Sequence, residues 1–139
     1  MVIDARLSDA FEIAEIEKKC FSRPWSKAAI ENAIVDPLYL VICAFCEDEL
    51  AAYITAVISP DSLDICNIAV KEKFRRLGFA TELLSEIKNR ALGKSVFLEV
   101  RSKNAAAIAL YEKTGFILAG KRKNFYSDPT DDALIMIFG

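Results

Sequence analysis

Apolar and polar residues follow two different periods along this chain, and the periods predict where helices and strands lie. Apolar positions three and four residues apart are typical of amphipathic helices, whereas short apolar runs between turn residues are typical of strands. Helices are predicted over residues 9–20, 27–34, 80–92 and 104–114. Strands are predicted over residues 38–46, 50–58, 63–70, 95–101, 116–123 and 133–138.

Capping and turn residues support several of these boundaries. Ser26 is a typical helix N-cap, and Trp25 and Ile30 have the spacing of a hydrophobic staple around it. Pro37 ends the second helix, because proline cannot donate the next backbone hydrogen bond. Gly93 suits the C-terminal cap of the third helix.

The predicted elements follow one another in the order α-α-β-β-β-α-β-α-β-β. The short links "EDE" and "SPDS" join the first three strands into an antiparallel meander. The strand–helix–strand unit over residues 63–101 places its two strands parallel. The sequence therefore predicts a single α/β domain over residues 1–139, with a mixed, mostly antiparallel sheet and helices on both faces.

Composition narrows the class of protein. Hydrophobic residues make up 53% of the chain, which is enough for a packed core. No window reaches the roughly 18 uninterrupted apolar residues of a membrane span, and the N-terminal residues lack a signal-peptide pattern. The net charge of −2 disfavours a general nucleic-acid binder. We therefore expect a cytoplasmic protein, monomeric or weakly dimeric, with no nucleic acid or membrane as partner.

The chain contains no histidine, which excludes a Ser-His-Asp or Cys-His mechanism and a histidine metal site. Cys43 and Cys46 form a C-x-x-C, a spacing that zinc and redox sites use. No second such pair follows, and both cysteines lie in the apolar run "YLVICAFC". We therefore interpret them as small core residues and expect no metal.

The stretch "AVKEKFRRLGFATELLSEI" carries the first sign of a binding site. It leads from a strand through a basic turn, with Arg75 and Arg76, to the start of a helix. Free backbone N–H groups and the helix dipole attract anions there, and Gly78 lets a ligand approach the backbone closely. A solvated basic turn is the alternative. The loop lacks the spacing of a Walker motif and the three glycines of a dinucleotide-binding loop.

The pattern Arg75-x-x-Gly78-x-Ala80 after the strand "NIAV" resembles the pyrophosphate loop of the GNAT superfamily of acyl-CoA N-acyltransferases. The order of elements is also similar to that fold. The segments "LEVRSKNAAAIALYEKTGF", "PWS" and "NIAV" resemble the branch that acetylates ribosomal proteins at an N-terminal alanine. Ala80 departs from the more usual glycine, and the tail "KRKNFYSDPTDDALIMIFG" keeps only part of the branch pattern.

The resemblance implies acetyl-CoA as cofactor, with its pantetheine arm paired to backbone groups of Ile68, Ala69 and Val70. It also implies that Asn104 contacts the cofactor, although this residue could serve only as a helix N-cap. The residues implied to hold the pyrophosphate are Arg75, Arg76, Leu77, Gly78, Phe79, Ala80 and Thr81.

Two residues match the catalytic pair of the family. Glu99 lies between Leu98 and Val100 in an apolar strand, where a carboxylate is costly unless it is paired or functional. Burial there would make it a better general base, and an ion pair with Arg101 or a lysine is the alternative. Tyr111 matches the general acid, and a core tyrosine with a satisfied hydroxyl is the alternative.

The acceptor end of the site is the least defined by sequence. By resemblance, Phe125 and Tyr126 are candidates for contact with a peptide N-terminus. The aspartates of the following loop could attract a basic peptide, but a solvated loop is the favoured interpretation; they are Asp128, Asp131 and Asp132.

The leading hypothesis is an N-terminal protein acetyltransferase that transfers acetyl to the α-amine of an alanine, with a ribosomal protein as its partner. The transfer would be a direct attack in a ternary complex. A second hypothesis keeps the enzyme class but takes a polyamine, an antibiotic amine or an internal lysine as acceptor. A third is an acyl-CoA-binding regulatory module without turnover.

Overall fold

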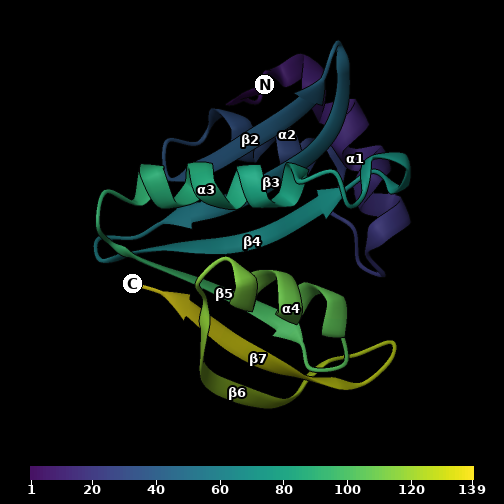
Figure 1. Ribbon diagram of the computed structural model, residues 1–139. Helices are drawn as coiled ribbons and strands as arrows, with labels where there is room; N and C mark the ends of the chain where they lie inside the picture. The colour runs from purple at the N-terminus through teal and green to yellow at the C-terminus, as the bar shows by residue number, and fades with distance from the viewer.

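The computed structural model describes residues 1–139 and contains one seven-stranded sheet in the order β1-β2-β3-β4-β5-β7-β6 (Figure 1). All neighbouring strands are antiparallel except β4 and β5, which are parallel. The strands are β1 (Val2–Asp4), β2 (Tyr39–Cys46), β3 (Glu49–Ile58), β4 (Ser62–Val70), β5 (Ser95–Arg101), β6 (Ile117–Tyr126) and β7 (Asp131–Phe138).

Helices cover both faces of the sheet. The helices α3 and α4 share one apolar cluster with the sheet, and α1 and α2 pack in a second cluster on the opposite face (Figure 1). None of the helices has the length and apolar character needed to cross a bilayer. The helices are α1 (Ala10–Cys20), α2 (Lys27–Val35), α3 (Phe79–Ala91) and α4 (Ala105–Lys113), with short 3-10 turns at η1 (Leu7–Asp9) and η2 (Glu72–Phe74).

The sequence predictions of four helices, six strands, a meander and one parallel pair are confirmed. The Ser26 hydroxyl accepts a hydrogen bond from the backbone N–H of Ala29 at 3.1 Å, as expected of an N-cap. Strand β1 was not predicted, because three residues are too few to show a period of two. Cys43 is fully buried and Cys46 partly so, in agreement with their interpretation as core residues.

The parallel pair of β4 and β5 is short, and the two strands then separate. They pair only from Ser62–Ser95 to Asp64–Phe97. Directly beyond this point, the register of β4 against β3 shifts by one residue at Cys66, which is a β-bulge. A bulge bends its strand and increases the local twist. As a result, β4 and β5 diverge and open a wedge in the middle of the sheet (Figure 1).

Candidate active site

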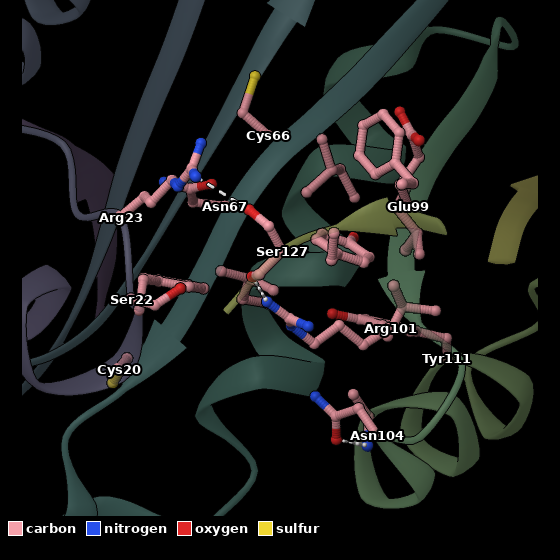
Figure 2. Close-up of a pocket in the computed structure, with 18 residues that line it drawn as sticks. Cys20, Ser22, Arg23, Cys66, Asn67, Glu99, Arg101, Asn104, Tyr111 and Ser127 are labelled. Carbon is pink, nitrogen blue, oxygen red and sulfur yellow. Dashed lines mark hydrogen bonds between the residues drawn. The ribbon is translucent and has the colours of Figure 1, made fainter. Parts of the chain in front are cut away.

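The wedge between β4 and β5 contains a cavity of about 450 Å³. Its walls come from five parts of the chain, which Figure 2 shows converging on one space. Residues that line it are Ile65–Ile68 of β4, Leu98–Arg101 of β5, Asn104, Ala107 and Tyr111 at α4, residues 20–23 at the end of α1, and Phe125, Tyr126 and Ser127 of the β6–β7 hairpin.

One edge of β4 faces the wedge with backbone groups that no other strand pairs. Lys71 donates its N–H to Ala51 of β3, and the direction of backbone groups alternates along an antiparallel strand. Ala69 therefore bonds to β3, whereas Ile68 and Val70 direct their N–H and C=O groups into the wedge. Those two residues can pair with an extended, amide-containing ligand. Of the three residues predicted to pair with the pantetheine arm, Ala69 already forms its backbone hydrogen bonds with β3.

The loop that follows β4 offers a run of free donors. The backbone N–H groups of residues 76–81 have no acceptor within the protein, and they converge at the first turn of α3. Arg76 and Gly78 have positive φ angles of 64° and 89°, which turn the backbone into this concave shape. Such a nest of N–H groups at a helix N-terminus fits a pyrophosphate.

The side chain of Arg75 lies beside this loop and points back along β4. Its Nε donates to the carbonyl oxygen of Val70 at 3.2 Å, and its guanidinium also contacts Cys20 Sγ at 3.7 Å. Arg75 therefore links the end of β4 to the end of α1. Its charge remains close to the loop of free N–H groups.

Tyr111 lies at the wall of the wedge that α4 provides. Its side chain is 7% exposed, and its hydroxyl has no hydrogen-bond partner in the protein. Burial, with a smaller contribution from Tyr126, raises the pKa of Tyr111 to about 12. The sequence alternative of a satisfied core hydroxyl is wrong, because the O–H is free to donate into the cavity.

Glu99 also lines the cavity, but the burial expected of it is not observed. Its side chain is 35% exposed and forms an ion pair with Arg122 of β6 at 3.3 Å. The predicted alternative partner, Arg101, instead contacts the β6–β7 hairpin. Leu98 and Val100 are buried under α4, and Glu99 points to the opposite face because side chains alternate along a strand.

Asn104 is the N-cap of α4, as the alternative interpretation of its role predicted. Its Oδ1 accepts the backbone N–H of Ala107 at 3.2 Å. The side-chain amide nitrogen is directed away from this bond (Figure 2). Since Asn104 also lines the cavity, capping leaves an N–H donor available to a ligand.

The β6–β7 hairpin forms a further wall of the cavity. Arg101 donates to the carbonyl oxygens of Ser127 at 3.0 Å and Pro129 at 2.7 Å, and its guanidinium stacks on the Tyr126 ring at 4.5 Å. Phe125 and Tyr126 contact each other edge to face. The two predicted aromatic residues thus lie together at the cavity. Arg101, which the sequence offered as an alternative partner of Glu99, instead holds this hairpin.

Two of the three aspartates named for this loop, Asp131 and Asp132, are structural rather than solvated. Asp131 is 7% exposed, and its carboxylate accepts from the Ser102 hydroxyl at 2.5 Å and the backbone N–H of Lys103 at 3.2 Å. The bond from Ser102 is the main reason that the pKa of Asp131 is lowered. Asp132 accepts the N–H of Asn124 and pairs with Lys121. Only Asp128 remains exposed, beside Arg23.

Arg23 was not singled out by sequence, and it spans the mouth of the wedge. It donates to Ser127 Oγ at 2.9 Å (Figure 2), and it lies 3.5 Å from the Asp128 carboxylate. The residue and its Ser127 partner are 104 positions apart along the chain, so no local pattern indicates the contact. The loop after α1 and the β6–β7 hairpin are therefore tied together over the cavity.

Residues 10–116 match the family model described as the acetyltransferase (GNAT) family. The chain belongs to the GNAT family. Enzymes of this family transfer an acetyl group from acetyl-CoA, so the chain is an N-acetyltransferase. The wedge, the N–H loop and the free backbone edge of β4 are the parts of this chain that fit such a ligand.

Relatives with known names agree on the family. The ribosomal protein bS18-alanine N-acetyltransferase of Salmonella typhimurium is 36% identical over 130 residues, which covers 88% of this chain and 85% of the relative. The crystal structure of the corresponding Escherichia coli enzyme superposes with a TM-score of 0.90 at 31% identity, covering 99% of this chain and 92% of the other. Arabidopsis thaliana NAA60 in complex with acetyl-CoA shares the fold, with a TM-score of 0.89 at 19% identity and coverage of 99% and 97%.

A glycine substitution tests the N–H loop. We expect Gly78→Ala to weaken acetyl-CoA binding about tenfold, because a Cβ at φ +89° costs about 1–2 kcal/mol and the strain is relieved by moving the loop. Gly93→Ala is the matched control: its φ is +87°, a Cβ there also meets open space, and it lies at the other end of α3. Isothermal titration of both variants with acetyl-CoA makes the comparison. Equal dissociation constants would contradict the assignment of the loop.

The raised pKa of Tyr111 predicts a pH-dependent stability. An unfolded tyrosine loses its proton near pH 10, whereas folded Tyr111 keeps it to about pH 12. Its stabilising contribution is therefore complete below pH 10 and is lost as the pH rises toward 12, by up to about 1.4 kcal/mol per pH unit. Urea unfolding at pH 9 and pH 11 should show wild type losing stability relative to Tyr111→Phe. A difference that stays constant with pH would refute the assignment.

Proposed function

We propose that this protein acetylates the α-amine of an N-terminal alanine, with a ribosomal protein as its natural acceptor. The observation that carries the proposal is the wedge itself: Glu99, Tyr111 and the β6–β7 hairpin line one cavity with β4, and the N–H loop directly follows β4. The names of the relatives from Salmonella typhimurium and Escherichia coli support the choice of acceptor.

The chemistry of the amine favours an N-terminus over a lysine. A free α-amine has a pKa of about 7.7–8.0, so a substantial fraction is neutral and nucleophilic near pH 7.5. A lysine, at about 10.4, must first give up a proton at a cost of about 4 kcal/mol. A partly exposed glutamate such as Glu99 is a weak base and suits the more acidic α-ammonium group.

In the proposed mechanism both substrates occupy the wedge together. Acetyl-CoA supplies an acetyl group activated as a thioester. The N–H of Val70 lies at the edge of the wedge, where it can polarise the carbonyl under attack. Glu99, directly or through a water molecule, accepts the proton that the amine loses as the C–N bond forms. Arg122 forms an ion pair with Glu99 at 3.3 Å and so orients this carboxylate at the cavity.

Tyr111 would stabilise the departing sulfur by hydrogen bonding rather than by proton donation. With its pKa near 12 and that of a thiol near 8.5, full transfer is uphill by about 5 kcal/mol. The hydroxyl is free and protonated at physiological pH, so it can donate a hydrogen bond to the thiolate as the C–S bond breaks. The thiolate then takes its proton from solvent.

The proposed acceptor is tested by thiol release from acetyl-CoA. We expect turnover with a short peptide that begins with a free alanine, and none with the same peptide carrying a blocked N-terminus and an internal lysine. Turnover with the blocked peptide alone would move the acceptor to lysine. Turnover only with a polyamine would reject the protein acceptor and keep the enzyme class.

The catalytic pair is tested by two isosteric variants. We expect Glu99→Gln to lower kcat by about 10²-fold or more, the usual contribution of a general base. Tyr111→Phe should lower kcat by a smaller factor, about tenfold for one lost hydrogen bond to a charged sulfur. Glu112→Gln, an exposed change on α4, is the matched control and should have no effect. An unchanged kcat in Glu99→Gln would exclude its role as base.

A further inference from the structure

A second carboxylate, Glu17 of α1, lies behind the wall of the wedge. It is 1% exposed, which is rare for a charged residue unless it is fully hydrogen-bonded. Its Oε1 accepts the backbone N–H of Trp25 at 2.8 Å, and its Oε2 accepts Asn67 Nδ2 at 2.8 Å and the hydroxyl of Tyr53. Three donors from the loop before α2, from β3 and from β4 thus meet on one carboxylate.

This carboxylate fixes the direction of the Asn67 amide. Asn67 donates from its side-chain Nδ2 to Glu17 Oε2, so its NH₂ group faces Glu17. The amide oxygen of Asn67 is then the polar atom left over. It has no hydrogen-bond partner in the protein and is not sealed from solvent, and Asn67 lines the cavity. The network therefore places a hydrogen-bond acceptor, the amide oxygen of Asn67, at the wall of the wedge.

Asn67, which carries this amide oxygen, lies across the wedge from Glu99. Asn67 is three residues beyond the last β4–β5 pair, Asp64–Phe97, and Glu99 is two residues beyond it. The bulge at Cys66 takes up the extra residue, so the two lie at the same level of the diverging strands. A neutral primary amine between them has two N–H groups and one lone pair. One N–H can bond to each side, and the lone pair is left for the attack.

We propose that Asn67 binds the acceptor amine through its side-chain oxygen, and that Glu17 is the positioning residue that keeps this oxygen turned into the cavity. The proposal rests on the proposed function for the site in which it acts, and it requires only that the acceptor is a primary amine. It predicts that changes in this network affect the acceptor and leave acetyl-CoA binding intact, since the N–H loop and the edge of β4 at Val70 do not touch it.

Four variants test the network. In Glu17→Gln, the new amide donates to Asn67, which turns its oxygen away from the cavity, and we expect KM for the acceptor to rise about tenfold. In Asn67→Asp, two carboxylates face each other, and the loss should be larger. In the double variant, the amide at position 17 again has an acceptor and the second oxygen of residue 67 again faces the cavity, so KM should return to within about threefold of wild type.

The fourth variant, Tyr53→Phe, separates positioning from simple stability. It removes one donor to Glu17 but leaves Glu17 an acceptor, so Tm should fall while KM for the acceptor stays unchanged. The dissociation constant of acetyl-CoA should stay within twofold of wild type in all four variants. The assay uses the alanine peptide, or spermidine where the wild type acetylates only that amine.

The possible results separate the two proposals. In one outcome the peptide is not acetylated, while spermidine is turned over and the KM for spermidine rises in Glu17→Gln. This result rejects the proposed acceptor but supports the role of Asn67. An acetylated peptide whose KM is unchanged in Glu17→Gln overturns the role of Asn67 and leaves the proposed function standing. A KM that follows Tm across the series, Tyr53→Phe included, also overturns it, and so does an absence of turnover with any amine.

Discussion

The separation of β4 from β5 after the Asp64–Phe97 pair is the constraint on which the rest of the site depends. A continuous sheet would consume the backbone hydrogen bonds of both strands. Here the bulge at Cys66 bends β4 away, and no strand of the protein pairs with the edge at Ile68 and Val70. The cofactor loop, the pair Glu99 and Tyr111, and the hairpin are all arranged around that opening, which is lined by strands that packing on both faces holds rigid.

Much of the fold could be predicted from the sequence because its signals are local. The period of apolar residues defines α3, and Ser26 defines the start of α2 by a contact within four residues. The glycine-containing loop before α3 was predicted as an anion site for the same reason: positive φ and a helix start are both local properties. Strand β1 exists only through its pairing with β2, so its three residues carry no signal of their own.

The error at Glu99 shows how a one-dimensional pattern misleads. Its neighbours in sequence, Leu98 and Val100, are buried, but a strand directs successive side chains to opposite faces. An apolar neighbourhood along β5 therefore says little about the surroundings of Glu99. The contacts of Arg23 with Ser127 and of Glu17 with Asn67 were equally out of reach, because they join residues 104 and 50 positions apart that only the folded chain brings together.

In the proposed function, the parts of the wedge that would hold the two substrates come from different stretches of the chain. The end of β4 and residues 76–81 would form the cofactor side, and residues 20–23 and the β6–β7 hairpin would form the acceptor side. Arg23 joins the two acceptor segments to each other and makes no contact with the cofactor loop. Apart from Cys20, whose sulfur contacts Arg75, substitutions in these acceptor segments can accumulate without disturbing residues 76–81. Such a scaffold can acquire new substrates while its acyl donor stays the same.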